Sequence, residues 1–273
     1  KKRGIPTIIK FFGKDTAQEL VKKGKYADLV VGNNVLAHVP DLNDFIEGIK
    51  ILLKPNGIFT LELPHLMQLM AKNQFDTIYH EHYSYFSFLT VKKIFRSHGL
   101  TLFDVEEIST HGGSLRIYGC HKKNKDFRVT VRVDALTRKE IVFGMNRLET
   151  YQKFSVNVAK TKQSFLKFLI EAKKKGKSIV GYGAPAKGNT FLNYCGIRTD
   201  FIEYTVDKSP SKQNHFLPGV RIPVYDPGKI SKTHPDFVLI LPWNIKSEII
   251  GQMSKIKRWG GKFVTAIPRV TVL

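Results

Sequence analysis

The stretch Ala27-Asp28-Leu29-Val30-Val31-Gly32-Asn33-Asn34 decides the fold class of this chain. Its short apolar run is typical of a strand buried in a parallel sheet. It ends in polar residues, and open α/β sheets bind their ligands beyond the carboxyl ends of such strands. We therefore expect an α/β fold with a binding site that includes Asn33 and Asn34, the alternative being that Asn33 only caps the loop. Their amides suit a ribose, a carboxylate or a carbonyl group.

Strand and helix patterns alternate on both sides of this stretch, which is the layout of an α/β domain. Helices are marked by one apolar face and by polar residues or glycine at their ends. For the first half we predict strands at 5–12, 27–32, 58–63, 100–105 and 114–120, with helices at 14–23, from about 42 to 53, and at 91–98.

The pattern changes near Lys122. A short extended piece at 127–133 precedes a long helical region at 137–175, and a second α/β unit follows. Its predicted strands are 178–183, 201–206, 237–241 and 262–266, with a helix at 245–258. We expect three parts: an α/β domain at 1–122, a helical connector at 123–176 and a second α/β domain at 177–273.

Composition narrows the class of protein. The chain has 273 residues, 42% of them hydrophobic, which suits a globular protein. The net charge of +21 suggests a nucleic-acid partner. The basic residues are scattered, however, and no nucleic-acid-binding motif is present, so we expect an anionic small molecule instead. No apolar run approaches the length of a membrane span, and no signal peptide opens the chain, so we expect a cytoplasmic protein.

The segment from Phe75 to Phe86 concentrates proton-transfer groups: Tyr79, Glu81 and His82 stand among further aromatic rings. It suits a proton-transfer site, a metal site or an aromatic surface. Metal-ligand spacing is absent, and we predict no metal site within these residues. General acid–base chemistry fits better, because a His takes a proton near neutral pH, a Glu orients it, and a Tyr hydroxyl stabilises an enolate. His38 and His111 are further candidates.

A glycine-rich turn begins the last domain. Gly181-Tyr182-Gly183-Ala184-Pro185-Ala186 matches the dinucleotide fingerprint after a strand and before a predicted helix, and Asp207 follows at the expected distance. Lys187 and Asn189 add groups suited to a phosphate. The turn therefore predicts a pyrophosphate site for NAD or a nucleotide-sugar, while a purely structural glycine turn remains possible.

Four segments carry a family resemblance. They are Asn33-Asn34-Val35-Leu36-Ala37-His38-Val39-Pro40-Asp41, Asn73-Gln74-Phe75-Asp76-Thr77-Ile78-Tyr79-His80-Glu81-His82, Thr110-His111-Gly112-Gly113-Ser114-Leu115-Arg116 and Gly181-Tyr182-Gly183-Ala184-Pro185-Ala186-Lys187-Gly188-Asn189. In this order they closely resemble the sugar C-methyltransferase family, which uses S-adenosylmethionine (SAM) to methylate a ring carbon of nucleotide-linked keto deoxysugars, usually on dTDP.

The resemblance implies a function and a set of roles. His82 would remove the proton beside the ketone of a 4-keto sugar, while Tyr79 and Glu81 position and polarise the reacting groups. Asn34 and His38 would complete the pocket, and the resulting enolate would attack the methyl group of SAM. The turn around Lys187 would bind pyrophosphate in a C-terminal Rossmann-like domain, after a class I methyltransferase domain.

The chain also departs from the family. It lacks the zinc-binding cysteines of the family's N-terminal module and the glycine-rich SAM loop with the first strands of the methyltransferase sheet. We therefore expect a truncated methyltransferase domain with an exposed sheet edge. The alternatives are a nucleotide-sugar-binding fragment without catalysis and an NAD-dependent oxidoreductase. The sequence gives no oligomeric state.

Overall fold

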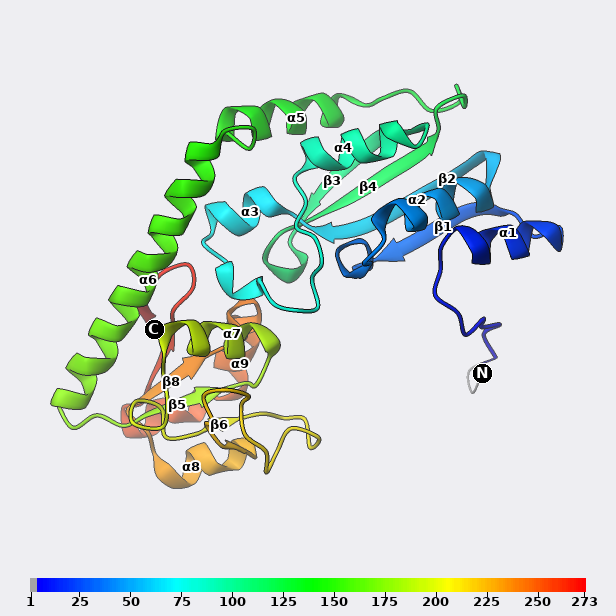
Figure 1. Cartoon of the computed structure of the whole chain (residues 1–273). Helices are drawn as coiled ribbons and strands as arrows, with labels where there is room; N and C mark the ends of the chain where they lie inside the picture. Colours follow the sequence, from blue (N-terminus) through cyan, green and yellow to red (C-terminus); the bar gives the residue numbers. More distant parts are fainter. Residues whose placement is uncertain (1–3) are drawn as a thin grey trace. The chain divides into compact units, whose positions relative to one another are not determined.

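The protein is described by a computed structural model that covers residues 4–273 (Figure 1). The chain divides into two compact units, and each is considered by itself. Unit 1 contains the chain up to Met67 together with Glu81–Arg147. Unit 2 contains Gln68–His80 together with Leu148–Leu273. The region predicted as a connector, 123–176, thus contributes to both units, and a short internal segment of the first half belongs to unit 2.

Unit 1 is a four-stranded mixed sheet with helices packed on it. Strands β1 and β2 are parallel, β4 is antiparallel to both β2 and β3, and the order across the sheet is β1-β2-β4-β3. The elements are α1 (Lys14–Lys22), β1 (Ala27–Asn33), η1 (Leu36–His38), α2 (Leu42–Leu52), β2 (Leu53–Pro64), α4 (Phe88–Ser97), β3 (Leu100–Ile108), η3 (Thr110–Gly112), β4 (Ser114–His121) and α5 (Val131–Phe143).

The core of unit 1 follows from the alternation along β2. Phe59 and Leu61 point to the helical side and are fully buried, while the residues that alternate with them along the strand are half-exposed. Phe59 stacks on Phe95 of α4 with ring centroids 4.9 Å apart. Ile46 and Ile49 bring the apolar face of α2 onto the same core. The α/β class predicted from the alternating pattern is therefore confirmed.

Two predictions for unit 1 are wrong. Residues 5–12 form no strand, and Phe11 is fully exposed, because a strand needs a hydrogen-bonding partner as well as an apolar composition. The strand at 27–32 exists as β1, but it is not buried: Leu29 and Val31 are 52% and 58% exposed. The reason is that β1 is the outermost strand of the described sheet, which agrees with the expected exposed edge.

Unit 2 is a six-stranded sheet in the order β10-β9-β8-β5-β6-β7, parallel except for β10. Its elements are most of α3 (Leu66–Ala71), η2 (Phe75–Thr77), α6 (Leu148–Lys174), β5 (Ile179–Tyr182), α7 (Ala186–Cys195), β6 (Thr205–Val206), β7 (Val224–Tyr225), η4 (Pro227–Lys229), α8 (Ile230–Thr233), β8 (Phe237–Ile240), η5 (Trp243–Ile245), α9 (Lys246–Gln252), η6 (Ser254–Trp259), β9 (Lys262–Thr265) and β10 (Thr271–Val272).

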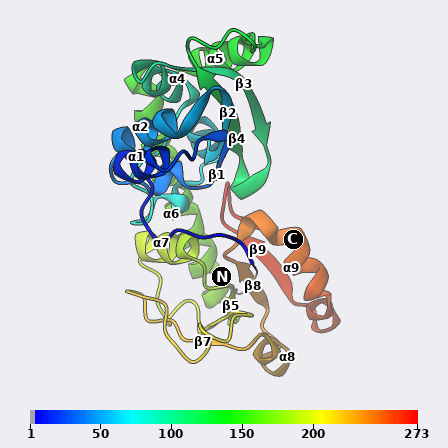
Figure 2. The ribbon, with the colours of Figure 1, turned by 90° about the vertical axis from the view of Figure 1, so that its right-hand side faces the viewer.

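Helices cover both faces of the unit 2 sheet. Helices α6 and α7 pack on one face, and α8 and α9 pack on the other (Figure 2). The central strands of the sheet are therefore buried on both faces. This is the Rossmann-like arrangement predicted for the C-terminal part. The long helical region predicted at 137–175 consists of two helices, the end of α5 and the whole of α6. Gly144, at φ 92°, ends α5 in the left-handed conformation that only glycine adopts readily.

Candidate functional site

A cluster of imidazole and phenol rings lies beyond the carboxyl end of β1 in unit 1. The rings of His38 and His82 have centroids 4.8 Å apart, and Tyr85 meets His82 edge-on at 5.5 Å. The backbone holds the two chain segments together, because the N–H groups of Tyr83 and Ser84 both donate to the carbonyl of Ala37. The structure thus brings together two residues, His38 and His82, that lie far apart in the sequence.

One contact in this cluster fixes a tautomer. The Nδ1 atom of His38 lies 2.8 Å from the backbone oxygen of Glu81. A carbonyl oxygen can only accept, so Nδ1 carries the hydrogen, and in the neutral ring Nε2 is the basic nitrogen. Glu81 therefore orients His38 through its backbone, while its own side chain is exposed. His82 is half-buried. The site can hold and move a proton.

The other predicted residues of the first half occupy three positions. Asn33 is the last residue of β1 and Asn34 follows it; both are exposed, and Asn34 has a left-handed backbone with φ 54°. His111 lies in the β3–β4 turn, which reaches the carboxyl end of β2 because Ser114 pairs with Pro64. These residues share one end of the unit 1 sheet. Tyr79, by contrast, belongs to unit 2.

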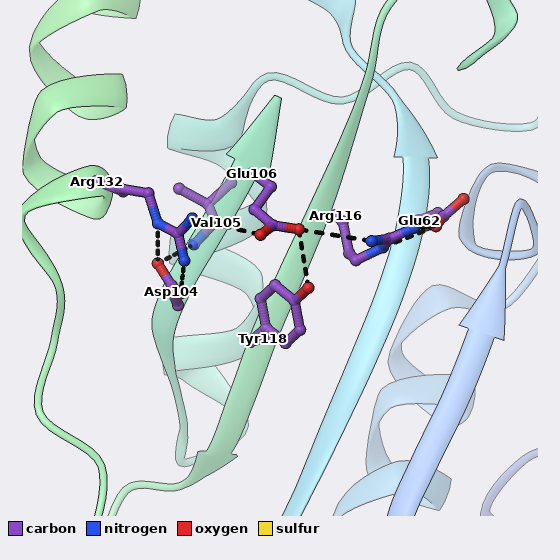
Figure 3. Close-up of polar contacts among 7 residues, drawn as sticks. All are labelled: Glu62, Asp104, Val105, Glu106, Arg116, Tyr118 and Arg132. Atoms are coloured by element: carbon purple, nitrogen blue, oxygen red, sulfur yellow. Dashed lines mark hydrogen bonds and ion pairs between the residues drawn. The ribbon is translucent and has the colours of Figure 1, made fainter. Parts of the chain in front are cut away.

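A charged network crosses the same sheet next to Asn33 (Figure 3). The Nε atom of Arg116 on β4 donates to Glu62 of β2 at 2.8 Å, and Arg116 also faces Glu106 of β3. Tyr118 donates to Glu106 at 2.9 Å. Glu62 holds the pKa of Arg116 above its ordinary value by hydrogen bonding. The network fixes polar side chains on the half-exposed face of the sheet.

The predicted glycine turn of unit 2 has the expected backbone, but its polar groups are engaged within the chain. Gly183 has φ 92°, and a Cβ atom there would lie 2.6 Å from Pro242. The N–H of Ala184 donates to Asp207 at 2.7 Å, so the carboxylate proposed for a ribose closes the turn itself. Gly181 and Tyr182 are buried, and burial raises the pKa of Tyr182.

Lys187, in the first turn of α7, takes part in a mixed polar and aromatic cluster. Its Nζ donates to the side chain of Asn244 at 2.8 Å and lies 4.8 Å from the ring centre of Trp243. The indole N–H of Trp243 donates to buried Asp76 at 2.7 Å. Burial lowers the pKa of Lys187, and Asp76 opposes that shift. Asn189 is half-exposed two residues further along the helix.

Sequence reasoning missed two buried acids. Asp76 is 1% exposed and Glu140 is fully buried. Asp76 lies inside a recognised motif but next to more reactive residues, so it drew no separate prediction. Glu140 accepts from His65, 75 positions earlier, and no local signal marks that pairing.

The described residues fit part of a cofactor pocket. Asn33 and Asn34 offer exposed amides at the carboxyl end of a parallel strand, which suits the hydroxyl or carboxylate groups of SAM. Within residues 4–273, no glycine-rich turn joins a strand of unit 1 to a helix, so these residues do not form the whole pocket. In the same residues no group of three His, Cys, Asp or Glu side chains is arranged to hold a metal ion, and no helix has the length and apolarity for a membrane crossing.

Comparison with known proteins gives the class and then the family. A family model described as "Methyltransferase domain" matches residues 4–105, and one described as "C-methyltransferase C-terminal domain" matches residues 109–268. Together with the α/β fold, these matches define a methyltransferase-type protein. The chain belongs to the C-methyltransferase family, because the second model alone covers more than half of it.

A curated relative agrees with this assignment. The chain is 35% identical over 271 residues to the C-methyltransferase NovU of Streptomyces niveus. The match covers 99% of this chain and 64% of NovU, so the chain spans less than two-thirds of that relative. Among solved structures, two described as crystal structures of M1.HpyAVI, one with SAM, are 12% identical with TM-scores of 0.28 and 0.26, covering 44% and 47% of this chain and 55% and 66% of theirs. Scores this low carry no argument.

Proposed function

We propose that the protein is a SAM-dependent C-methyltransferase that acts on a nucleotide-linked 4-keto deoxysugar, most simply one carried on dTDP. The observation that supports it best is the ring cluster of His38 and His82 in a chain of the C-methyltransferase family. Methylation at carbon needs a base, because the carbon beside a ketone becomes nucleophilic only after it loses a proton. The cluster supplies that base.

In this proposal His82 removes the proton on the carbon next to the ketone. His38, whose Nε2 is the basic nitrogen, lies within reach of the same ring cluster and accepts a hydrogen bond or the proton in turn. The family resemblance also assigns Tyr79 and Glu81 to polarising and positioning the reacting groups, and Asn34 to completing the pocket. SAM, when bound, supplies an electrophilic methyl group. The product keeps the ketone, and the proton leaves through the imidazole.

Unit 2 is the proposed holder of the nucleotide. The N-terminus of α7, with Lys187 and Asn189, offers N–H groups and a cation suited to a pyrophosphate. His111 is assigned to substrate binding on the resemblance. A non-catalytic nucleotide-sugar-binding role remains the alternative. The zinc module implied by the resemblance and the cytoplasmic location expected from the sequence stay predictions.

Substitution of His82 tests the mechanism. In the full-length gene product, His82→Asn is expected to bind the keto sugar nucleotide while kcat falls by ~100- to 10,000-fold, as expected for loss of a positioned base. His80→Asn is the matched control, because His80 is exposed and stands only two residues away. A wild-type rate for His82→Asn together with a collapsed rate for His38→Asn would move the base to His38.

Ligand titration tests the nucleotide-sugar binding that the proposal and its alternative share. Isothermal calorimetry of this chain with dTDP, SAM and NAD is expected to show binding of dTDP. Heat with NAD and none with dTDP would count against a nucleotide-sugar role. Methyl transfer by the full-length gene product, followed by mass spectrometry of the sugar, decides between catalysis and binding alone.

A further inference from the structure

A buried carboxylate in unit 1 collects three hydrogen-bond donors. Glu140 of α5 accepts from Nε2 of His65 at 2.8 Å, from the N–H of Phe88 at 2.6 Å and from the N–H of Leu89 at 2.8 Å. The side chains of Glu140 and His65 are both fully buried. A charge this deep is strongly destabilising unless it is paired and hydrogen-bonded, and here the donors come from two places in unit 1: His65, which follows β2, and the first two residues of α4.

The carboxylate lies at the N-terminus of α4. Phe88 and Leu89 are the first residues of that helix, and their N–H groups have no partner within it. The N-cap, Ser87, satisfies only the N–H of Thr90. Glu140 therefore completes the helix start from another element, and the helix dipole favours its negative charge.

His65 connects the same carboxylate to the sheet. It follows β2, its N–H donates to the carbonyl of Gly113, and it forms a β-bridge with Phe86. The N–H of Leu66 donates to Phe86 as well. Because a carboxylate only accepts, Nε2 of His65 carries a hydrogen, while its Nδ1 is buried without a hydrogen-bond partner. The hydrogen bond to Glu140 therefore requires the orientation of the His65 ring in which Nε2 faces the carboxylate.

The segment 81–87 is consequently fixed at both ends. Its beginning is held by the carbonyl of Ala37 through Tyr83 and Ser84, and its end is held at Phe86 and at the start of α4. His82 and Tyr85 lie on this segment, and the ring cluster depends on their place.

We propose that His65 and Glu140 are positioning residues for the proton-transfer cluster: their buried hydrogen bond sets the segment that carries His82. This inference rests on the proposed function for its consequence in catalysis, but not for the placement of His82. Neither residue touches the substrate. Both act through the backbone of residues 86–89.

The experiment compares variants that keep or remove the donor of His65. His65→Gln retains an N–H at the distance of Nε2, whereas His65→Leu fills the space without one. Glu140→Gln leaves one acceptor oxygen for three donors. Glu47→Gln is the matched control, because Glu47 lies on α2 of the same unit in a partly exposed pair with Lys50.

The first readout is the imidazole NMR signal of His82 in the histidine-labelled chain, assigned from His82→Asn. His65→Leu and Glu140→Gln are expected to move that signal and to speed amide exchange at Tyr83 and Ser84, while His65→Gln restores both. The second readout is kcat of the full-length gene product, expected to fall ~10- to 100-fold with little change in KM, the effect of a misplaced reacting group.

The outcomes separate positioning from simple stabilisation. An unchanged His82 signal and kcat in His65→Leu, with a lower melting temperature, would overturn the proposal. If Glu140→Gln does not fold, the His65→Leu and His65→Gln pair decides alone. If the wild-type gene product transfers no methyl group, the proposed function fails, and the NMR comparison still accepts or rejects the positioning role.

Discussion

Replacing Asp76 with Asn is the most informative single change in unit 2. Asp76 is 1% exposed, and its Oδ2 accepts from the indole of Trp243 while Oδ1 has no hydrogen-bond partner. Burial raises the pKa of Asp76 to about 6, against a hydrogen bond from Trp243 and the charge of Lys187, which lower it. Unit 2 therefore keeps a carboxylate at neutral pH in a place that disfavours its charge.

The sign and size of the effect follow from that shift. A folded pKa above the unfolded value of 3.8 means that Asp76 favours folding below about pH 4, and that this advantage is lost as the pH rises to about 6. The shift to about 6 corresponds to ~3 kcal/mol against folding at pH 8. Asp76→Asn removes the charge and keeps an acceptor for Trp243, but buries an amide NH₂ in place of Oδ1. We expect a net gain of ~1–3 kcal/mol at neutral pH, because an unpaired buried polar group has its own cost.

The assay is urea unfolding followed by tryptophan fluorescence, because both tryptophans of the chain, Trp243 and Trp259, lie in unit 2. Between about pH 4.5 and about pH 7.5, the stability of Asp76→Asn relative to wild type is expected to rise by ~2 kcal/mol. Asp236→Asn is the control of opposite sign. The hydrogen bond from Lys177 lowers the pKa of Asp236. The stability of Asp236→Asn relative to wild type should therefore fall as the pH rises. If the difference in unfolding free energy between Asp76→Asn and wild type did not change with pH, Asp76 would not carry a buried charge.

Three further changes test the packing and the caps. Asp41→Ala removes the side chain that caps α2 by accepting from the N–H of Asp44, and should lower the stability of unit 1 by ~1 kcal/mol in urea unfolding followed by circular dichroism. Gly119→Ala would place a Cβ 2.1 Å from the ring of Phe59, and should cost ~1–3 kcal/mol in the same assay unless the ring can move. Phe165→Ala empties a fully buried place in unit 2 and should cost ~3–5 kcal/mol by tryptophan fluorescence; a smaller loss would mean that α6 collapses into the space.

Local patterns predicted those elements whose signals are local. The start of α2 was readable because Asp41 caps it, and its buried face because Phe45, Ile46 and Ile49 recur at helical spacing. The burial of β1 was not readable, because an apolar run looks the same in the centre of a sheet and at its edge. Only pairing decides, and pairing is a property of strands far away in the sequence.

The residues of the candidate site also divide into those that local patterns predict and those that only the fold reveals. His38 and His82 could be proposed from residue type and from the family resemblance, since reactive side chains are few and distinctive. The buried hydrogen-bonded pairs within each unit could not be predicted in this way. Glu140 meets His65 across 75 residues, and Trp243 meets Asp76 across 167, so each pairing exists only once the chain has folded. The supporting hydrogen bonds of a site are therefore the part that sequence patterns reveal least.

The segment 73–82 shows that a motif rich in reactive residue types also contains residues whose role is structural. Asn73 donates to Thr161, and Phe75 packs on Phe191, so the first part of the motif is anchored within unit 2. From Glu81 onward the chain belongs to unit 1, where His82 joins His38. A contiguous motif thus contains structural anchors and reactive groups that belong to different units. Substitutions at Asn73 or Phe75 should reduce stability first, whereas substitution at His82 should reduce turnover in a protein that remains folded.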